Sequence, residues 1–242
     1  MKNLEKSWLL NQYIAHRGLH NKEFPENSLP AFENAKNKGF AIECDVHLTK
    51  DNQIVVFHDM TTGRLTNVDG VVKDMTLKEL KELKLNNSNF SIPTLEEVLK
   101  VVDGSVPLLI EIKGFSKKNR LEKLLYETML KYKGDYAVQS FNPFSITWFR
   151  KYAPEVIRGQ LSSSFKNRKM SRLRKFVLSK MLLNPISRPD FVAYNYEDLL
   201  QETDRITKLP ILAWTVRTKE DQENLLNLCD NIIFEGFIPK RY

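Results

Sequence analysis

The feature that most constrains the fold of this chain is the alternation of short apolar segments with amphipathic helical ones. Such alternation predicts a parallel sheet covered by helices. Because eight strands are predicted in 242 residues, we expect an α/β fold of the (β/α)₈ TIM-barrel type, formed by one domain over residues 1–242. The predicted strands are Tyr13–His16, Ala41–Val46, Pro107–Ile112, Tyr136–Ser140, Ile157–Leu161, Phe191–Tyr194, Ile211–Val216 and Asn231–Phe234.

Two parts of the chain depart from an ideal barrel. Residues 54–58 form an extra apolar segment after the second strand, which we interpret as a small hairpin insertion that folds back on that strand. If Asp51-Asn52 is a two-residue loop, the register places Asp45 opposite His58. Too few residues follow the last strand for a full helix, so we expect a short or missing last helix, with residues 4–11 covering the bottom of the barrel.

Local sequence patterns mark several helix ends. Thr76 and Thr94 are each followed three residues later by a glutamate, Glu79 and Glu97, which is the pattern of a capping box. A helix that starts at residue 27 or 28 is expected to stop at Gly39.

Composition limits the cellular setting and the partners. Hydrophobic residues make up 42% and charged residues 28% of the chain, no apolar run reaches membrane-spanning length, and residues 1–12 are too polar for a secretory signal. Cys44 and Cys229 are far apart and lack the spacing of a metal site. We therefore expect a cytoplasmic protein.

The net charge of +7 favours anionic partners, but no nucleic-acid-binding motif accompanies it. Much of the excess lies in the basic segment 166–183. This segment could dock on an anionic membrane. We favour instead a solvated outer helix that packs on the barrel by its apolar face.

Polar residues gather at the carboxyl ends of the first three predicted strands, where a TIM barrel carries its active site. Taken strand by strand, they are His16 and Arg17, Glu43 and Asp45, and Glu111 and Lys113. Near the end of the seventh strand lies Trp214, which we interpret either as barrel core or as an apolar wall for the carbon chain of a substrate.

The spacing of the carboxylates suggests a metal site. Glu43 and Asp45 are two residues apart, so both side chains leave the same face of a strand. Neighbouring carboxylates repel each other unless a cation lies between them, and their oxygens suit Ca²⁺ or Mg²⁺. Glu111 offers a third carboxylate and Lys113 a counter-charge. The alternative is an exposed hairpin with ordinary polar residues and a structural Glu111–Lys113 pair.

Several short motifs resemble the glycerophosphodiester phosphodiesterases in order and spacing over nearly the whole chain. They are H-R-G at 16–18, P-E-N-S at 25–28, E-C-D-V at 43–46, V-V-F-H-D at 55–59, I-P-T-L-E-E-V-L at 92–99, I-E-I-K at 110–113 and A-W-T-V at 213–216. The resemblance implies catalytic histidines, a bound divalent cation and cationic contacts to phosphate. The residues that match these roles are His16 and His58 for catalysis, Glu43, Asp45 and Glu111 for the metal, and Arg17 and Lys113 for the phosphate.

The activity that the resemblance implies is hydrolysis of a glycerophosphodiester to glycerol 3-phosphate and an alcohol. Cleavage at phosphorus needs a base, an acid and positive charge on the non-bridging oxygens, and either histidine can take either proton-transfer role. The substrate's 2-hydroxyl can reach phosphorus and form a 1,2-cyclic phosphate, a route also suggested by similarity to the phosphatidylinositol-specific phospholipases C; direct attack by water is the rival. Two other functions stay open: lysophospholipase D activity, and a non-enzymatic phosphate-binding barrel, which would be expected to lack a histidine or carboxylate.

Overall fold

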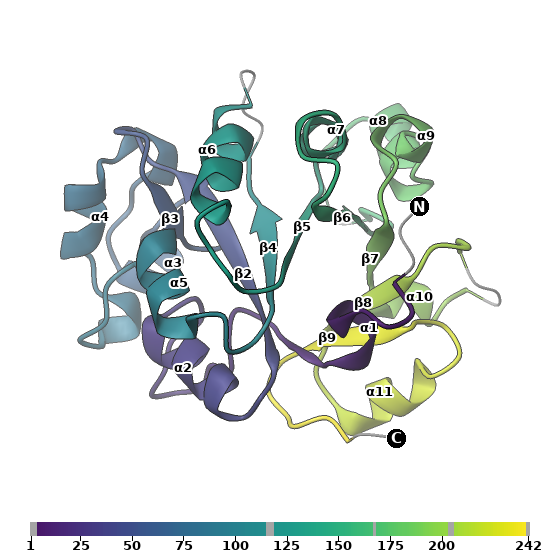
Figure 1. Ribbon diagram of the computed structural model, residues 1–242, viewed down its shortest axis with the longest axis horizontal. Coiled ribbons are helices and arrows are strands. Elements are labelled where there is room, and N and C mark those ends of the chain that lie inside the picture. Colours follow the sequence, from purple (N-terminus) through teal and green to yellow (C-terminus); the bar gives the residue numbers. More distant parts are fainter. Residues whose placement is uncertain (1–3, 115–118, 167, 203–205, 241–242) are drawn as a thin grey trace. The chain divides into compact units, whose positions relative to one another are not determined.

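A computed structural model describes residues 4–114, 119–166, 168–202 and 206–240 (Figure 1). The chain forms two compact units. The N-terminal unit comprises residues 15–136, and the C-terminal unit comprises residues 137–242 together with residues 1–14. Strand β1 (Ile14–Ala15) lies at the boundary between them in sequence.

The N-terminal unit is built on the long strand β2 (Ala41–Leu48). This strand pairs in parallel with β4 (Leu108–Ile112) and antiparallel with β3 (Ile54–Val56). The helical elements of this unit are α2 (Leu29–Asn37), α3 (Gly63–Thr66), η1 (Val72–Asp74), α4 (Leu77–Glu82), η2 (Leu85–Asn87), α5 (Leu95–Val102) and α6 (Arg120–Met129). Helices α3, α4 and α5 gather about β3, and α2 lies beside α5 (Figure 1).

The β2–β3 hairpin exists as predicted, but its predicted register is wrong by one residue. Val46 pairs with Val56 and Leu48 with Ile54, so Phe57, not His58, lies opposite Asp45 and donates its N–H to the Asp45 carbonyl at 2.9 Å. The reason is the loop. Asn52 adopts a left-handed conformation with φ of 62°, which lengthens the turn to three residues and shifts the partner strand.

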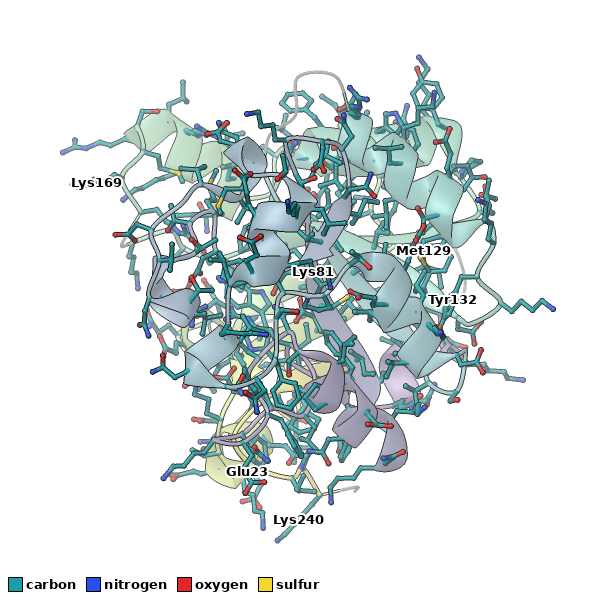
Figure 2. All side chains as sticks on the ribbon, turned by 90° about the vertical axis from the view of Figure 1, so that its left-hand side faces the viewer. Glu23, Lys81, Met129, Tyr132, Lys169 and Lys240 are labelled. Carbon is teal, nitrogen blue, oxygen red and sulfur yellow. The ribbon has the colours of Figure 1, made fainter. Side chains whose placement is uncertain are left out.

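An apolar cluster fixes the hairpin to the rest of the N-terminal unit. Val55 and Phe57 are buried with residues from α3, η1, α4 and η2. The predicted capping boxes are both present, with Thr76 and Glu79 at the start of α4 and Thr94 and Glu97 at the start of α5. Lys81, labelled on α4 in Figure 2, also forms an ion pair with Glu97. Local caps and this cluster together hold the segment that leads into His58.

In the described part of the C-terminal unit, the strands pair in parallel. Strand β6 pairs with β5 and β7, and β8 pairs with β7 and β9. The strands are β5 (Tyr136–Ser140), β6 (Ile157–Ser162), β7 (Phe191–Asn195), β8 (Ile211–Val216) and β9 (Asn231–Phe234). The helices are α1 (Trp8–Asn11), α7 (Pro143–Tyr152), α8 (Arg172–Ser179), α9 (Asn184–Ser187), α10 (Tyr196–Leu199) and α11 (Lys219–Asn224). Helix α9 packs against α7 (Figure 1).

Strands that alternate with helices along both units give the chain the (β/α)₈ TIM-barrel fold, which confirms the predicted class. Residues 4–11, predicted to cover the bottom of the barrel, lie at the start of β9. The side-chain amide of Asn231, the first residue of β9, donates to the carbonyls of Leu9 and Gln12 around α1, at 2.8 and 2.7 Å. Residues 235–240, the described part after β9, contain no helix, as expected. Among the described residues, none of the helices is both long and apolar enough to cross a bilayer.

The basic segment 166–183, of which Asn167 lies outside the described residues, contains the expected outer helix. No residue of α8 is fully buried, but the apolar residues Val177 and Leu178 are partly buried. A hydrogen bond of 2.9 Å from the Ser162 hydroxyl to the Leu178 carbonyl ties its C-terminal turn to β6. The side chains of Leu173 and Phe176 are exposed, so the apolar residues of α8 are covered only in part.

Candidate active site

Three buried carboxylates come together on β2 and β4. Asp45 pairs in register with Glu111 across the parallel strands, and Glu43 leaves the same face of β2 two residues earlier. All three side chains are buried, and one oxygen of each lies within 4.8 Å of the others. The residues predicted as metal ligands are therefore adjacent in the structure.

A tight turn after β1 aims a backbone donor at this cluster. Arg17 and Gly18 both have left-handed backbone conformations, with φ of 55° and 78°. A Cβ on Gly18 would lie 2.8 Å from the carbonyl carbon of Ala31, so only glycine fits. The turn brings the Arg17 N–H to 3.0 Å from Glu43 Oε2. A non-glycine residue such as Arg17 rarely adopts this conformation, and such strain is typical of functional sites.

Two cationic side chains surround Asp45. Lys113 Nζ lies 3.0 Å from Asp45 Oδ1 and 2.7 Å from Glu111 Oε1, and Arg17 Nε lies 3.5 Å from Asp45 Oδ2. Burial acts to raise the pKa of Asp45, but the charges of Lys113, His58 and Arg17 outweigh it and hold that pKa well below its usual range. Asp45 is therefore the carboxylate that stays ionised.

The other two carboxylates behave in the opposite way. Burial raises the pKa of Glu43 well above its ordinary range, and the charges of Asp45 and Glu111 raise it further. Burial also raises the pKa of Glu111 to about 7, although Lys113 opposes this effect. Full ionisation of three adjacent carboxylates needs more positive charge nearby than Arg17 and Lys113 supply. Glu43 and Glu111 therefore favour their protonated forms.

The charges of both predicted histidines act on Asp45 and lower its pKa. His58 follows β3, and its Nδ1 is 2.6 Å from Asp59 Oδ1. Burial lowers the pKa of His58, while the charge of Asp45 raises it. The charge of His16, directly after β1, helps to lower the pKa of Asp45. His47 Nε2 lies 3.2 Å from the carbonyl oxygen of His58, so it positions the segment rather than the carboxylates.

Glu26, in the P-E-N-S motif, joins two arginines. Its Oε1 lies 2.6 Å from Arg17 Nη1 and 2.7 Å from Arg64 Nη2. Arg64 also forms an ion pair with Asp59, the partner of His58. The N-cap of α2 is Ser28, as the predicted start at residue 27 or 28 allowed. Glu26 and Arg64 thus connect the Arg17 turn to the His58 segment.

The residues at this site that sequence reasoning missed include Asn27 and Arg64, besides Glu26 and Asp59. Asn27 donates from Nδ2 to Asp45 Oδ2 at 2.8 Å and accepts from the Asp45 N–H at 3.4 Å, so it fixes the orientation of Asp45. Its place in the P-E-N-S motif was the available signal. Arg64 belongs to no quoted motif, and its side chain is half exposed, so no sequence pattern would have identified it.

Trp214 lies on β8 in the C-terminal unit. Its ring packs edge-on against Phe141, with centroids 5.6 Å apart, and Phe141 packs in turn against Phe165 at 5.9 Å. These contacts make Trp214 part of an aromatic cluster within that unit. Its predicted contact with substrate stays a prediction.

The carboxylate cluster has the chemistry of a hard-cation site. Asp45 Oδ1 is buried, and the Lys113 ammonium lies 3.0 Å from it. A carboxylate oxygen has two lone pairs, so this oxygen can accept a second ligand besides the ammonium. With Glu43 and Glu111 beside it, the donor set consists of oxygens only, which suits Ca²⁺ or Mg²⁺.

Comparison with known proteins identifies relatives over most of the chain. A sequence model of the Glycerophosphoryl diester phosphodiesterase family matches residues 16–234. A glycerophosphodiester phosphodiesterase of Caldanaerobacter subterraneus is 35% identical over 227 residues, which cover 88% of each chain. A mouse lysophospholipase D is 32% identical over 145 residues, which cover 54% of this chain and 45% of the mouse protein.

Among solved structures, an Oleispira antarctica phosphodiesterase in complex with its product sn-glycerol-3-phosphate matches with a TM-score of 0.77 at 25% identity. The match covers 93% of this chain and 92% of that one. A glycerophosphodiester phosphodiesterase of Parabacteroides distasonis matches with a TM-score of 0.73 at 25% identity and covers 92% of each chain.

Proposed function

The chain belongs to the glycerophosphoryl diester phosphodiesterase family, and from this premise we propose that it hydrolyses glycerophosphodiesters to sn-glycerol 3-phosphate and an alcohol. We further propose that residues 1–242 act as one catalytic domain. The observation that carries the proposal is the cluster of Glu43, Asp45 and Glu111 with Arg17 and Lys113, because it combines cation ligands and phosphate-binding groups at one place.

In this proposal Glu43, Asp45 and Glu111 hold a divalent cation, Ca²⁺ or Mg²⁺. When bound, the cation supplies positive charge to the phosphate and lowers the pKa of the attacking hydroxyl. Burial is the main reason that the pKa values of Glu43 and Glu111 are raised, and the negative charge of Asp45 raises both further. A cation bound between them would favour their ionised forms.

The phosphate is assigned to Arg17 and Lys113. Both are largely buried, and their positive charge is available to the non-bridging oxygens. Lys113 contacts the same two carboxylates that the cation would use, Asp45 and Glu111. We therefore expect the cation and Lys113 to compete for those oxygens, which would direct the Lys113 ammonium toward substrate.

His16 and His58 are proposed to move the protons. One accepts the proton of the attacking oxygen, and the other donates a proton to the departing alcohol oxygen. Asp59 accepts from His58 Nδ1 at 2.6 Å, so it fixes the tautomer in which Nε2 is the nitrogen left for proton transfer. Burial keeps the pKa of His58 below its ordinary value, which favours the neutral, proton-accepting form at neutral pH.

For the nucleophile we propose the substrate's own 2-hydroxyl group. One histidine removes its proton, its oxygen bonds to phosphorus, and the bond from phosphorus to the alcohol oxygen breaks as the other histidine protonates that oxygen. Water then opens the 1,2-cyclic phosphate with the histidine roles reversed, giving glycerol 3-phosphate. Intramolecular attack has a large entropic advantage over recruiting water for the first step.

One assay tests the activity. The purified protein is incubated with glycerophosphocholine, glycerophosphoethanolamine, glycerophosphoglycerol and a lysophosphatidylcholine, with added Ca²⁺ or Mg²⁺ or after exhaustive chelation. We expect glycerol 3-phosphate from the soluble diesters, loss of turnover on chelation and in Glu43→Gln, and normal turnover in the exposed control Glu96→Gln. Full activity of chelated protein would overturn the metal assignment, and a preference for the acylated substrate would favour lysophospholipase D activity.

A deoxy analogue tests the cyclic route. A glycerophosphodiester analogue that lacks the 2-hydroxyl should not be cleaved, since it has no internal nucleophile. Cleavage of the analogue at a rate close to that of the natural substrate would leave water as the nucleophile.

A further inference from the structure

We propose that residues 168–188 form a docking surface for anionic lipid membranes. This membrane-docking surface comprises α8, α9 and the short segments before each helix, and it belongs entirely to the C-terminal unit. Docking at this surface is independent of the catalytic roles proposed above.

The first observation is a concentration of exposed apolar side chains. Leu173 is 73% exposed, Phe176 56%, Leu182 50% and Ile186 55%. Leu173 and Phe176 are three residues apart on α8 and therefore lie on the same face of that helix. Single exposed apolar residues are common on protein surfaces, but several within fourteen residues of chain indicate an interaction site.

The second observation is charge of one sign. No aspartate or glutamate occurs between Glu155 and Asp190. The same stretch supplies seven cationic residues to the surface, namely Arg168, Lys169, Arg172, Arg174, Lys175, Lys180 and Arg188. Figure 2 shows Lys169 projecting outward from the segment that precedes α8. Cations that alternate with exposed apolar residues are typical of helices that lie in the headgroup region of a membrane.

The third observation is that the helices are already formed. Ser171 caps α8 through a hydrogen bond from the Arg174 N–H to its hydroxyl at 3.3 Å. Arg150 on α7 donates to the Ile186 carbonyl at 2.6 Å and so ties α9 to the unit while the Ile186 side chain stays exposed. Docking therefore needs little further ordering of the chain, which would otherwise weaken binding.

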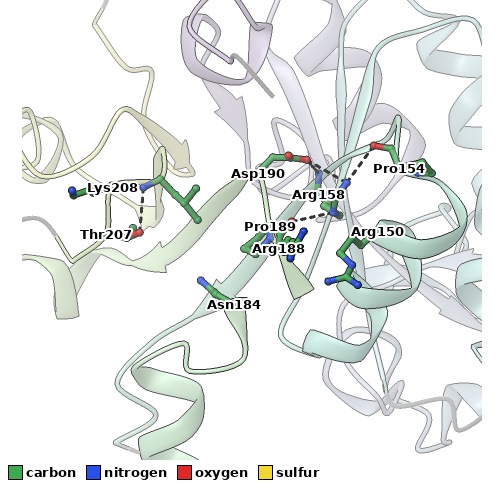
Figure 3. Close-up of a pocket in the computed structure, with 10 residues that line it drawn as sticks. Arg150, Pro154, Arg158, Asn184, Arg188, Pro189, Asp190, Thr207 and Lys208 are labelled. Atoms are coloured by element: carbon green, nitrogen blue, oxygen red, sulfur yellow. Dashed lines mark hydrogen bonds and ion pairs between the residues drawn. The ribbon is translucent and has the colours of Figure 1, made fainter. Parts of the chain in front are cut away.

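The positive charge continues into a cavity beside α9. This cavity, of about 850 Å³, lies among the loops at the starts of β6, β7 and β8, and Asn184 and Arg188 of the membrane-docking surface line it (Figure 3). Among the described residues that line it, Asp190 is the acidic one and pairs with Arg158, so Arg150, Arg188 and Lys208 supply the excess of cations. An excess of cations next to the apolar side chains suits the phosphate of a lipid headgroup.

A membrane explains the exposed apolar side chains and the positive charge together. A nucleic acid would contact the cations but leave Leu173 and Phe176 in water, whereas an anionic bilayer accepts the apolar side chains and attracts the charges. Long basic side chains such as Arg172 and Arg174 can extend to the headgroups while their stems cover apolar surface.

Sedimentation with vesicles tests the proposal on the full chain. The probes are phosphatidylcholine vesicles and vesicles of phosphatidylcholine mixed with phosphatidylglycerol, at low and high salt. We expect wild-type protein to sediment with the anionic vesicles and not with the neutral ones, and to be released by salt. Failure to sediment with anionic vesicles, or equal sedimentation with both kinds, would overturn the proposal.

Two variants and a matched control locate the surface. Leu173→Ser/Phe176→Ser should weaken vesicle binding at least ten-fold, roughly, because apolar burial is lost. Arg172→Gln/Arg174→Gln should weaken it by roughly five-fold per cation. The control Leu130→Ser/Lys131→Gln removes an exposed leucine and a lysine after α6 and should bind as wild type does.

The apolar variant and the control separate membrane insertion at α8 from binding by charge alone. If Leu173→Ser/Phe176→Ser binds anionic vesicles like wild type, the contact is electrostatic only and the insertion of α8 is wrong; stronger capture by an RNA duplex than by vesicles would point to nucleic acid. Equal loss in the control would also overturn the proposal. Turnover of soluble glycerophosphocholine should be unchanged in every variant, which separates failure of docking from failure of the enzyme.

Discussion

Two groups of buried charges in this protein serve opposite purposes. In the N-terminal unit, Glu43, Asp45 and Glu111 lie together on two parallel strands, with Lys113 and Arg17 as the cations that contact Asp45. In the C-terminal unit, Arg158 forms an ion pair with Asp190 at 3.6 Å and donates to the carbonyls of neighbouring loops (Figure 3). In the first group negative side chains outnumber positive ones, whereas in the second group one positive side chain is paired with one negative side chain.

The two groups differ in how far neighbouring residues neutralise and hydrogen-bond their charges. Arg158 at the start of β6 is satisfied by the chain itself, including the carbonyls of Arg188 and Val156 at 3.2 and 3.3 Å. The carboxylates are satisfied only in part, and the pKa of Glu43 is held well above its usual range by burial and by Asp45. A site that costs stability in the free protein and recovers it on binding is typical of function, whereas a matched pair is typical of structure.

The largest expected effect separates catalysis from stability. His16→Ala and His58→Ala should each lower kcat by about 10²–10⁴-fold, because a positioned proton-transfer group is lost. KM and the midpoint of thermal unfolding should change little, since both side chains are only partly buried. Steady-state kinetics and calorimetry measure these values, and near-normal kcat in either variant would remove that histidine from the mechanism.

The matched pair should show the reverse result. Arg158→Met leaves the Asp190 carboxylate buried without its counter-charge and should lower the free energy of unfolding by about 3 kcal/mol. The kcat of the folded protein should stay normal. Urea unfolding and kinetics test this, and Arg158→Met/Asp190→Asn should recover part of the stability. A large loss of kcat in the stable double variant would show that this group is not purely structural.

A smaller effect is expected at Arg64, which forms ion pairs with Glu26 and with Asp59, the partner of His58. Arg64→Lys cannot hold Glu26 and Asp59 with a planar fork, so His58 should be less well oriented. We expect kcat to fall by roughly ten-fold or less. Because the side chain of Arg64 is half exposed, stability should fall by less than about 1 kcal/mol. A kcat equal to that of wild type would show that Asp59 alone orients His58.

Sequence patterns predicted most of the fold because its determinants are local. Tyr136–Ser140, Ile211–Val216 and Asn231–Phe234 have the predicted bounds, since apolar runs bounded by polar residues define strands without tertiary information. The capping boxes at Thr76 and Thr94 are likewise local. The hairpin register was not predictable, because the left-handed conformation of Asn52 changed the length of its loop.

The candidate site was predictable to the extent that its residues share strands. The clustering of Glu43, Asp45 and Glu111 follows from the two-residue spacing on β2 and from the parallel pairing of β2 with β4. Arg64 reaches Glu26 from 38 residues away in sequence, and no periodic pattern encodes such a contact. The exposure of Leu173 on α8 was also hidden, because an amphipathic sequence does not reveal whether its apolar face is covered.

The pH dependence of chelated protein should reveal the stability cost of the carboxylates. Because burial raises the folded-state pKa of Glu43 above its unfolded value, the folded protein binds more protons than the unfolded chain. Glu43 therefore contributes to folding stability when the pH is below its unfolded pKa of about 4.3. This contribution is lost as the pH rises toward the pKa of Glu43 in the folded protein. Glu43→Gln should therefore be at least as stable as wild type at neutral pH. A clear loss of stability in chelated Glu43→Gln would contradict this cost.

Calorimetric titration of chelated protein with Ca²⁺ and with Mg²⁺ tests the cation site most directly, in wild type and in Glu43→Gln with Glu96→Gln as control. We predict that wild type and the control bind one cation and release protons as they do so, and that Glu43→Gln binds it at least ten-fold more weakly, roughly, because a charged ligand is lost. Equal binding in wild type and Glu43→Gln, or no binding in wild type, would contradict a cation site on β2 and β4.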